Sequence, residues 1–343
     1  MPKNPMKILF LMTLISGVLI SLCTNSWMGA WMGLEINLLS FIPLLTSNLN
    51  KFSAESALKY FLIQSIASST LLFLILLTIH YNEMEHLMKI KTWSNLITIP
   101  LLMKSASAPL HWWLPAMIEG LSWTNCFIIL TIQKIAPMIL ISYTLINSYF
   151  IQFMIIMSAF MGAVGGFNQT SLRKILSFSS INNIGWMLVT MIINPNLWSM
   201  YFFIYAMNIV IIISMTASMN LSYINQTFNS MNNNKLIKIT LFTSILSLGG
   251  LPPLMGFFPK WITIQFMTLN LMNFTSMILI MSSLITLHYY LRMMYTTLTI
   301  TNSETIWMTW IYMKFNHFKI TTLTLSITFI GVLACMMILP FID

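Results

Sequence analysis

Charged residues are scarce in this 343-residue sequence: only 7% are Asp, Glu, Lys or Arg, whereas 57% are hydrophobic. Soluble domains carry about 25% charged residues. The low charge and a mean hydropathy of +0.82 therefore exclude a soluble globular protein and indicate a membrane protein. The sequence also lacks a Gly-rich phosphate loop and a Gly-x-Gly-x-x-Gly pattern, which argues against a nucleotide site.

Cysteine is scarce as well. Cys23, Cys126 and Cys335 are isolated within apolar runs, and no two of them have Cys-x-x-Cys spacing. An iron–sulfur cluster needs clustered thiolates, and no pair of mid-depth histidines exists to ligate a haem. We therefore expect inert buried thiols, and no metal or cofactor on this chain.

The apolar runs predict about eleven transmembrane helices, because about 20 apolar residues span the hydrocarbon core as a helix. We place them at residues 6–23, 26–46, 56–79, 92–118, 123–145, 150–167, 172–192, 199–221, 236–268, 273–297 and 321–341. Residues 298–320, rich in aromatic residues and lysine, are predicted to lie at the membrane interface. No cleavable signal peptide is recognisable, so Met1 is expected to begin the mature chain. The predicted fold class is an all-α polytopic membrane protein.

The formal charge of +9 is distributed unevenly over these spans. Lys89 and Lys91 lie on one side of the membrane, beside Glu83 and Glu85. Eleven other basic residues lie on the side of the N-terminus: Lys3, Lys7, Lys51, Lys59, Arg173, Lys174, Lys235, Lys238, Arg292, Lys314 and Lys319. The positive-inside rule then places the N-terminus in the cytoplasm or mitochondrial matrix, and an odd number of spans places the C-terminus opposite. No solvated basic face of the kind that binds nucleic acid is present.

Two of the predicted spans contain helix-breaking residues. Pro109 interrupts the fourth span near residues 104–115, and Pro252 and Pro253 interrupt the ninth near residues 249–260. Breaks at matching positions predict two five-helix repeats, residues 6–145 and 150–297, which the odd number of helices makes inverted in the membrane. Two unrelated proline kinks are the alternative.

Four ionisable residues lie well inside apolar segments: Glu35, Lys104, Lys134 and Lys260. A charge at that depth costs roughly 2.5–3.5 kcal/mol on insertion scales, and such residues commonly mark ion or proton pathways. Lys104 and Lys260 adjoin the breaks, where they could also have a purely structural role. We expect Glu35 to pair with Lys104, because pairing offsets part of the cost of burial.

These groups could move protons because burial disfavours the charged form of a lysine, whereas a nearby carboxylate favours it. A lysine held between these influences can exchange protons near neutral pH, but a lysine in water, with a pKa of about 10.4, cannot. His111 follows the first break and is either a proton relay or a hydrogen-bonded core histidine. His288 could line the exit of a path, although a structural role is the plainer interpretation.

Five segments carry a resemblance to one known family. They are residues 31–37 (WMGLEIN), 104–115 (KSASAPLHWWLP), 133–137 (QKIAP), 168–181 (NQTSLRKILSFSSI) and 248–261 (LGGLPPLMGFFPKW). Together they resemble the antiporter-like membrane subunits of respiratory complex I. The 31 methionines, with abundant Ile, Asn and Thr, are also typical of an organelle-encoded protein from an AT-rich genome.

The resemblance implies a proton channel in the membrane arm, surrounded by other membrane-arm subunits, including neighbouring antiporter-like chains, and by membrane lipids. NADH, FMN, iron–sulfur clusters and ubiquinone would be bound by other subunits. In the family, the residues that match Glu35 and Lys104 form a pair. Lys134 matches the central lysine, and Lys260 the lysine after the second break. The chain would begin at the fourth of about fourteen family helices, in the inner mitochondrial membrane.

Two other functions remain open at this stage. A free-standing cation/proton antiporter would use the same glutamate and lysines. An assembly scaffold would retain the lysines without using them. A quinone site gains no support, since no aromatic cluster contains paired polar groups.

Overall fold

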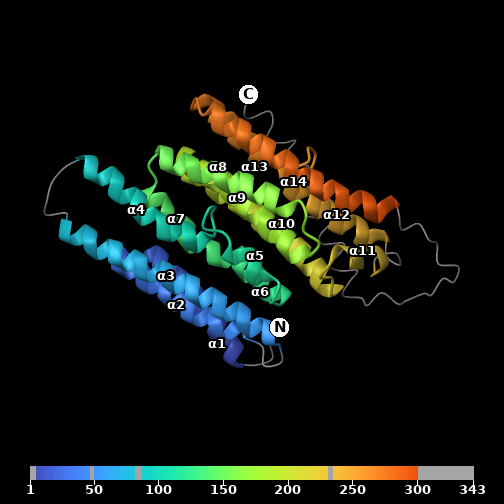
Figure 1. Ribbon diagram of the computed structural model, residues 1–343, viewed down its shortest axis with the longest axis horizontal. Helices are drawn as coiled ribbons and strands as arrows, with labels where there is room; N and C mark the ends of the chain where they lie inside the picture. Colours follow the sequence, from blue (N-terminus) through green and yellow to red (C-terminus); the bar gives the residue numbers. More distant parts are fainter. Residues whose placement is uncertain (1–4, 47–49, 82–86, 231–234, 300–343) are drawn as a thin grey trace.

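The structure, a computed structural model, describes residues 5–46, 50–81, 87–230 and 235–299 and is a bundle of long helices (Figure 1). Helices are expected because backbone groups in lipid must find hydrogen bonds within their own segment. The helices of these ranges are α1 (Pro5–Cys23), α2 (Trp27–Leu45), α3 (Lys51–Tyr81), α4 (Leu87–Ser105), α5 (Trp113–Ile118), α6 (Trp123–Leu130), α7 (Ile132–Thr144), α8 (Tyr149–Gly166), α9 (Leu172–Ile193), α10 (Pro195–Ser218), α11 (Ile224–Ser230), α12 (Lys235–Gly249), α13 (Phe257–Leu269) and α14 (Asn273–Thr299).

The predicted all-α membrane fold is confirmed. The described ranges contain eight helices that are long and apolar enough to cross a membrane. They contain no strand, and β-structure is limited to a single bridge between Ser171 and Tyr223. The predicted interfacial connection (298–320) lies outside the described ranges except for its first two residues, and the predicted last helix (321–341) lies outside them entirely. The count of eleven stays a prediction.

Three of the predicted spans are each built from two helices. The fourth consists of α4 and α5, and the ninth of α12 and α13, with the interruptions where proline predicted them. The fifth, predicted as one helix over residues 123–145, is divided into α6 and α7 at Thr131, whose φ and ψ are −122° and −75°. The predicted span is nevertheless confirmed, since Trp123–Thr144 is long and apolar enough to cross a membrane, and the interruption at Thr131 lies inside it.

The helices are arranged in order across the bundle (Figure 1). α1 to α3 lie along one flank, α12 to α14 lie along the other, and α8 to α10 lie between them. In its apolar window, α9 is 94% buried, whereas α1 is only 22% buried. The middle helix α9 is therefore the core of the fold, and α1 presents most of its surface outward.

The cysteine prediction is only partly correct. Cys126 on α6 is buried, but Cys23 at the end of α1 is exposed because α1 lies on the flank of the bundle. Cys335 lies outside the described ranges.

Candidate functional site

The first break positions Lys104. Between α4 and α5, residues 106–112 leave the helix, and Ala106 has a φ of 64°, a left-handed value that non-glycine residues rarely adopt. The carbonyl of Met103 accepts two hydrogen bonds here, from the backbone N–H of Ala106 at 3.2 Å and from the indole Nε1 of Trp113 at 3.1 Å. Lys104 lies in the last turn of α4, directly before the break, and is buried. Its ammonium thus lies beside irregular backbone, which is tolerated at membrane depth only when it is packed in protein or lines a wet cavity.

Glu35 interacts with Lys104 through space. Its carboxylate, on α2, acts electrostatically on Lys104 and on Tyr60. One carboxylate oxygen, Oε2, is buried and accepts no hydrogen bond from the residues that the structure describes. Among these residues, no salt bridge joins Glu35 to Lys104. Glu35 therefore has a free acceptor oxygen, although leaving a buried oxygen without a partner is costly. Its direct pairing with Lys104 stays a prediction.

Lys134 lies on α7, three residues after the unpredicted interruption at Thr131. It is the most deeply buried of the three intramembrane lysines: Lys134 is 2% exposed, Lys260 6% and Lys104 7%. Its Nζ donates to the backbone carbonyl of Ser180 on α9 at 3.4 Å and lies 5.5 Å from the ring centroid of Tyr205 on α10. One long hydrogen bond and one aromatic face satisfy an ammonium only partly, since it has three donors.

A small cavity of about 20 Å³ lies between Lys104 and Lys134, and both side chains line it. Its other polar lining residues are Asn37, Tyr60, Gln64, Ser105 and Gln133. The side-chain amides of Gln133 and Asn37 form a 2.9 Å hydrogen bond across it, from Nε2 to Oδ1. A polar cavity of this size has room for one water molecule. We call this region the first gap.

The second break positions Lys260. Between α12 and α13, Gly250 adopts a φ of +83°. The ammonium of Lys260 donates to two carbonyls freed by the break, those of Gly249 at 2.9 Å and Leu248 at 3.3 Å. It also lies 5.8 Å from the ring centroid of Trp186 on α9. The break therefore binds this lysine directly, through backbone carbonyls that the interrupted helix leaves free.

A smaller cavity of about 10 Å³ lies beside Lys260. Its polar lining residues, besides Lys260, are Asn183, Tyr201, Tyr205, Asn208 and Ser247. Tyr205 thus lies at this cavity and also beneath Lys134. We call the region between Lys134 and Lys260 the second gap.

The two histidines singled out in the sequence lie away from both gaps. His111 is buried, its Nδ1 lies 3.3 Å from the carbonyl of Pro109, and its ring contacts Phe178. It lines neither cavity. His288 is exposed and stacks on Phe167, with 5.6 Å between the ring centroids. The geometry gives His111 a backbone partner, and its role as a relay stays a prediction.

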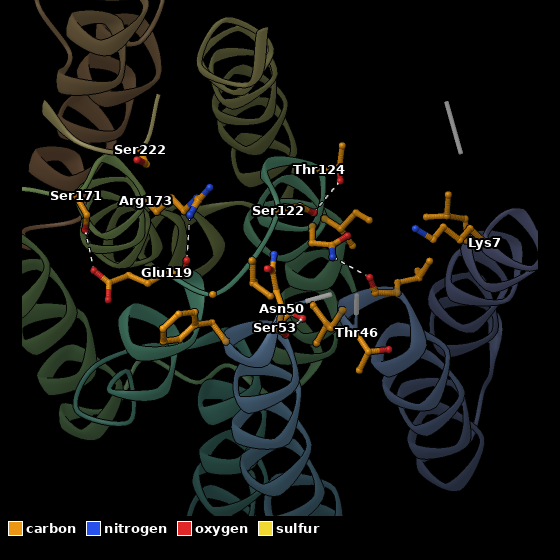
Figure 2. A pocket seen from close by; sticks show the side chains of 18 of the residues that line it. Lys7, Thr46, Asn50, Ser53, Glu119, Ser122, Thr124, Ser171, Arg173 and Ser222 are labelled. Carbon is orange, nitrogen blue, oxygen red and sulfur yellow. Dashed lines mark hydrogen bonds between the residues drawn. The ribbon is translucent and has the colours of Figure 1, made fainter. Parts of the chain in front are cut away.

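A large cleft of about 930 Å³ opens at one end of the bundle (Figure 2). It gathers the start of α1 at Lys7, the end of α2 at Thr46 and the start of α9 near Arg173. Glu119 links the two halves of the chain here: Ser171 donates to its Oε1 at 3.2 Å, and Lys174 pairs with the same oxygen at 2.8 Å. Lys7 of α1 and Arg173 of α9, which the charge pattern assigns to the same side of the membrane, both line this cleft.

No set of three or more His, Cys, Asp or Glu side chains that could hold a metal ion occurs in the ranges the structure describes. The polar groups that line the two gaps are hydroxyls, amides and ammonium groups instead.

Sequence reasoning missed the polar residues between the lysines. They are Asn37, Tyr60, Gln64, Gln133, Asn183, Tyr201, Tyr205, Asn208 and Ser247. Their position in the middle of apolar helices was a usable signal, because uncompensated polar groups are expensive at that depth. Which of them face one another depends on packing between helices, and a single sequence does not show it.

Comparison with known proteins relates the chain to one family. A family model described as NADH:quinone oxidoreductase/Mrp antiporter, TM, matches residues 24–286. A relative from Anopheles gambiae named NADH-ubiquinone oxidoreductase chain 2 is 45% identical over 333 residues, which cover 96% of each protein.

The fold is also similar to two solved structures. A chain of respiratory complex I from Thermus thermophilus with bound aureothin matches with a TM-score of 0.84 at 18% identity, covering 99% of this chain and 81% of that one. A chain of the Mrp complex from a Dietzia species matches with a TM-score of 0.70 at 16% identity, covering 84% of this chain and 59% of that one. At these identities the likeness is one of fold.

Proposed function

The chain belongs to the NADH:quinone oxidoreductase/Mrp antiporter family, and from that premise we propose that it translocates protons as a membrane-arm subunit of respiratory complex I. It is a multi-pass membrane protein, and we assign it to the inner mitochondrial membrane. Other subunits would bind NADH, FMN, iron–sulfur clusters and ubiquinone and carry out the electron transfer. This chain would contribute a proton path, driven by changes in charge and shape transmitted from its neighbours.

The observation that carries the proposal is the series of three buried lysines joined by two small polar gaps. Lys104 and Lys134 line the first gap, and Lys134 and Lys260 flank the second. We assign proton exchange to these lysines and the control of charge on Lys104 to Glu35. Single kinked helices do not require polar cavities between their lysines, so the gaps favour a path over isolated structural charges.

The free energy of moving a proton against the membrane potential is comparable to that of shifting the pKa of a buried lysine. Moving one proton against a membrane potential costs about 2.3 kcal/mol per 100 mV. A change of one pKa unit in a buried group corresponds to about 1.4 kcal/mol. Altering the surroundings of one lysine by a few such units can therefore drive a proton to the next lysine.

Two repeats, residues 6–145 and 150–297, remain our interpretation of the fold. In each half, the first two helices pack most extensively against each other: α1 with α2, and α8 with α9. Each half also places its broken helix fourth, α4–α5 or α12–α13. These parallels support inverted repeats with a lysine at each break. We place the N-terminus in the matrix, at the end of the bundle where the basic residues meet, and the C-terminus in the intermembrane space.

We propose that its partners are other membrane-arm subunits, neighbouring antiporter-like chains among them, and membrane lipids. Native-gel separation of mildly solubilised membranes tests this assignment, with mass spectrometry locating the chain against NADH dehydrogenase staining. Migration with a very large active band is expected. Migration in a small assembly without that activity would contradict the assignment and favour a free-standing antiporter of the Mrp type, to which the fold is similar.

The variant Lys134→Met separates a pump from a scaffold. The neutral side chain retains much of the volume but cannot carry a proton, so protons translocated per NADH should fall. Lys51→Met, at the exposed start of α3, is the matched control. An unchanged ratio in a fully assembled Lys134→Met enzyme would favour the scaffold.

A further inference from the structure

The side chain of Tyr205 lies between two of the buried lysines, Lys134 and Lys260. One face of its ring lies 5.5 Å from Nζ of Lys134, and the same side chain lines the cavity beside Lys260. It comes from α10, whereas the lysines come from α7 and α13. The residue is 3% exposed and therefore shielded from lipid and water.

The cavity of the second gap is at the lower limit for a water molecule. It measures about 10 Å³, compared with about 20 Å³ in the first gap, and a single water needs about 10–15 Å³. A proton crossing the second gap therefore depends more on side chains and less on water. Oxygen-bearing side chains must approach each other there for the path to be continuous.

Such side chains are present and can exchange their hydrogen bonds. Ser247 Oγ lies 2.9 Å from Oδ1 of Asn208 and 2.7 Å from the carbonyl of Ser244, but its single proton serves only one of them at a time. Tyr201 donates a 3.1 Å hydrogen bond to Oδ1 of Asn183. These groups line the same cavity as Tyr205. Neither His111 nor His288 lines this cavity.

We propose that the hydroxyl of Tyr205, supported by the Asn208–Ser247 pair, relays the proton between Lys134 and Lys260. The inference rests on the proposed function, because it concerns the path that function requires. The ammonium of Lys134 releases one proton, and the amine of Lys260 gains one. Between them, each hydroxyl or water oxygen accepts a proton on one side and releases its own on the other, so that no charge stays on the tyrosine. The ring face holds the charged form of Lys134 before the transfer.

The variant Tyr205→Phe tests the relay in the assembled enzyme. It keeps the ring and its contact with Lys134 but removes the hydroxyl. Coupled proton translocation should fall by about a hundredfold, the lower end of the usual contribution of a positioned proton-transfer group. Electron transfer from NADH to an artificial acceptor should be unchanged. The solvent deuterium isotope effect on coupled turnover should rise, a change that a merely structural role would not cause.

The matched control is Tyr143→Phe, which removes a hydroxyl from an exposed tyrosine on α7. Translocation in this control should equal that of the wild type. A Tyr205→Phe enzyme with the wild-type rate and isotope effect would overturn the relay.

Ser247→Ala is a second variant that removes only one buried oxygen, and it keeps the proposal testable if Tyr205→Phe does not assemble. We expect slower translocation with a raised isotope effect. A wild-type rate and isotope effect would count against the relay.

The variant Lys134→Met distinguishes a failure of the proposed function from a failure of the relay alone. If it translocates protons normally, the proposed function itself fails. If Lys134→Met is inactive while Tyr205→Phe is normal, only the relay fails.

Discussion

The two gaps between the buried lysines use different side chains for the same task. The first is bridged by an amide pair, Gln133 and Asn37, around a cavity that has room for one water molecule. The second has a cavity of half that volume, which is lined by tyrosines, amides and a serine, Tyr205 among them. The first gap therefore depends on water and the second on side chains, and each should be vulnerable to different substitutions.

The breaks beside the gaps also differ. Lys260 donates directly to carbonyls freed by the second break, whereas at the first break the carbonyl of Met103 is bonded by Trp113 and by the Ala106 N–H. Lys104 interacts through space with Glu35, whereas no acidic group of the ranges that the structure describes acts in this way on Lys260. The first lysine thus has a carboxylate within electrostatic range, whereas the last has two backbone carbonyls at its ammonium. Coupling to neighbouring subunits could accordingly enter through Glu35.

Among substitutions at the breaks and in the first gap, Gly250→Ala is expected to have the largest effect. The left-handed backbone costs a non-glycine residue about 1–2 kcal/mol. The added Cβ would lie 2.9 Å from Cδ of Lys260 and displace that side chain. Proton translocation should fall by about tenfold, since 1.4 kcal/mol in a barrier has that effect. Translocation by intact membranes is the measurement, and an unchanged rate would show that the position of Lys260 is not critical.

Glu35→Gln should have the next largest effect, confined to the first gap. A charge acting through space at about 4 Å is worth about 1 kcal/mol where water screens it, which corresponds to about fivefold in the rate of translocation. Glu55→Gln is the matched control, because Glu55 forms an exposed pair with Lys59 on α3, and such pairs contribute little. Equal rates for both variants would remove Glu35 from the mechanism.

Gln133→Leu breaks the amide pair of the first gap and should reduce translocation by about threefold, as expected for a lost hydrogen bond worth about 0.6 kcal/mol. Gln152→Leu is the control, because Gln152 bonds Asn147 at 2.9 Å in a solvent-exposed position. The rate ratio of the two variants is the quantity to measure. A ratio of one would mean that the amide pair serves packing only.

Ala106→Gly should have the smallest effect. It relieves a left-handed alanine at the first break but adds conformational entropy to the unfolded chain, and the two contributions nearly cancel, to within about 1 kcal/mol. Thermal inactivation and translocation should both match the wild type. A large loss of activity or thermal stability would show that alanine and glycine are not interchangeable at the left-handed position of the first break.

Much of this organisation could be predicted from the sequence. Prolines at 109, 252 and 253 marked the two breaks, and the depth of Lys104, Lys134 and Lys260 marked the lysines as exceptional. The all-α membrane fold followed from apolar runs of helix-spanning length. These features are local, so each can be recognised within about 20 residues of sequence.

Other features could not be predicted because they arise from packing between distant segments. Nothing in the sequence around Thr131 marks the interruption there, since the nearest helix breaker, Pro137, lies inside α7. Gln133 and Asn37 are 96 residues apart, and the contact between Lys134 and Tyr205 joins α7 to α10. The exposure of Cys23 follows from the outer position of α1.

The most direct test of the account replaces Lys134 with arginine and measures protons translocated per NADH in membranes, normalised to the amount of assembled enzyme. Arginine retains the positive charge but does not release its proton in a protein. If Lys134 exchanges protons between the two gaps, Lys134→Arg should translocate as poorly as Lys134→Met. A Lys134→Arg enzyme that translocates at the wild-type ratio would show that only the charge is needed, and would contradict a path through this lysine.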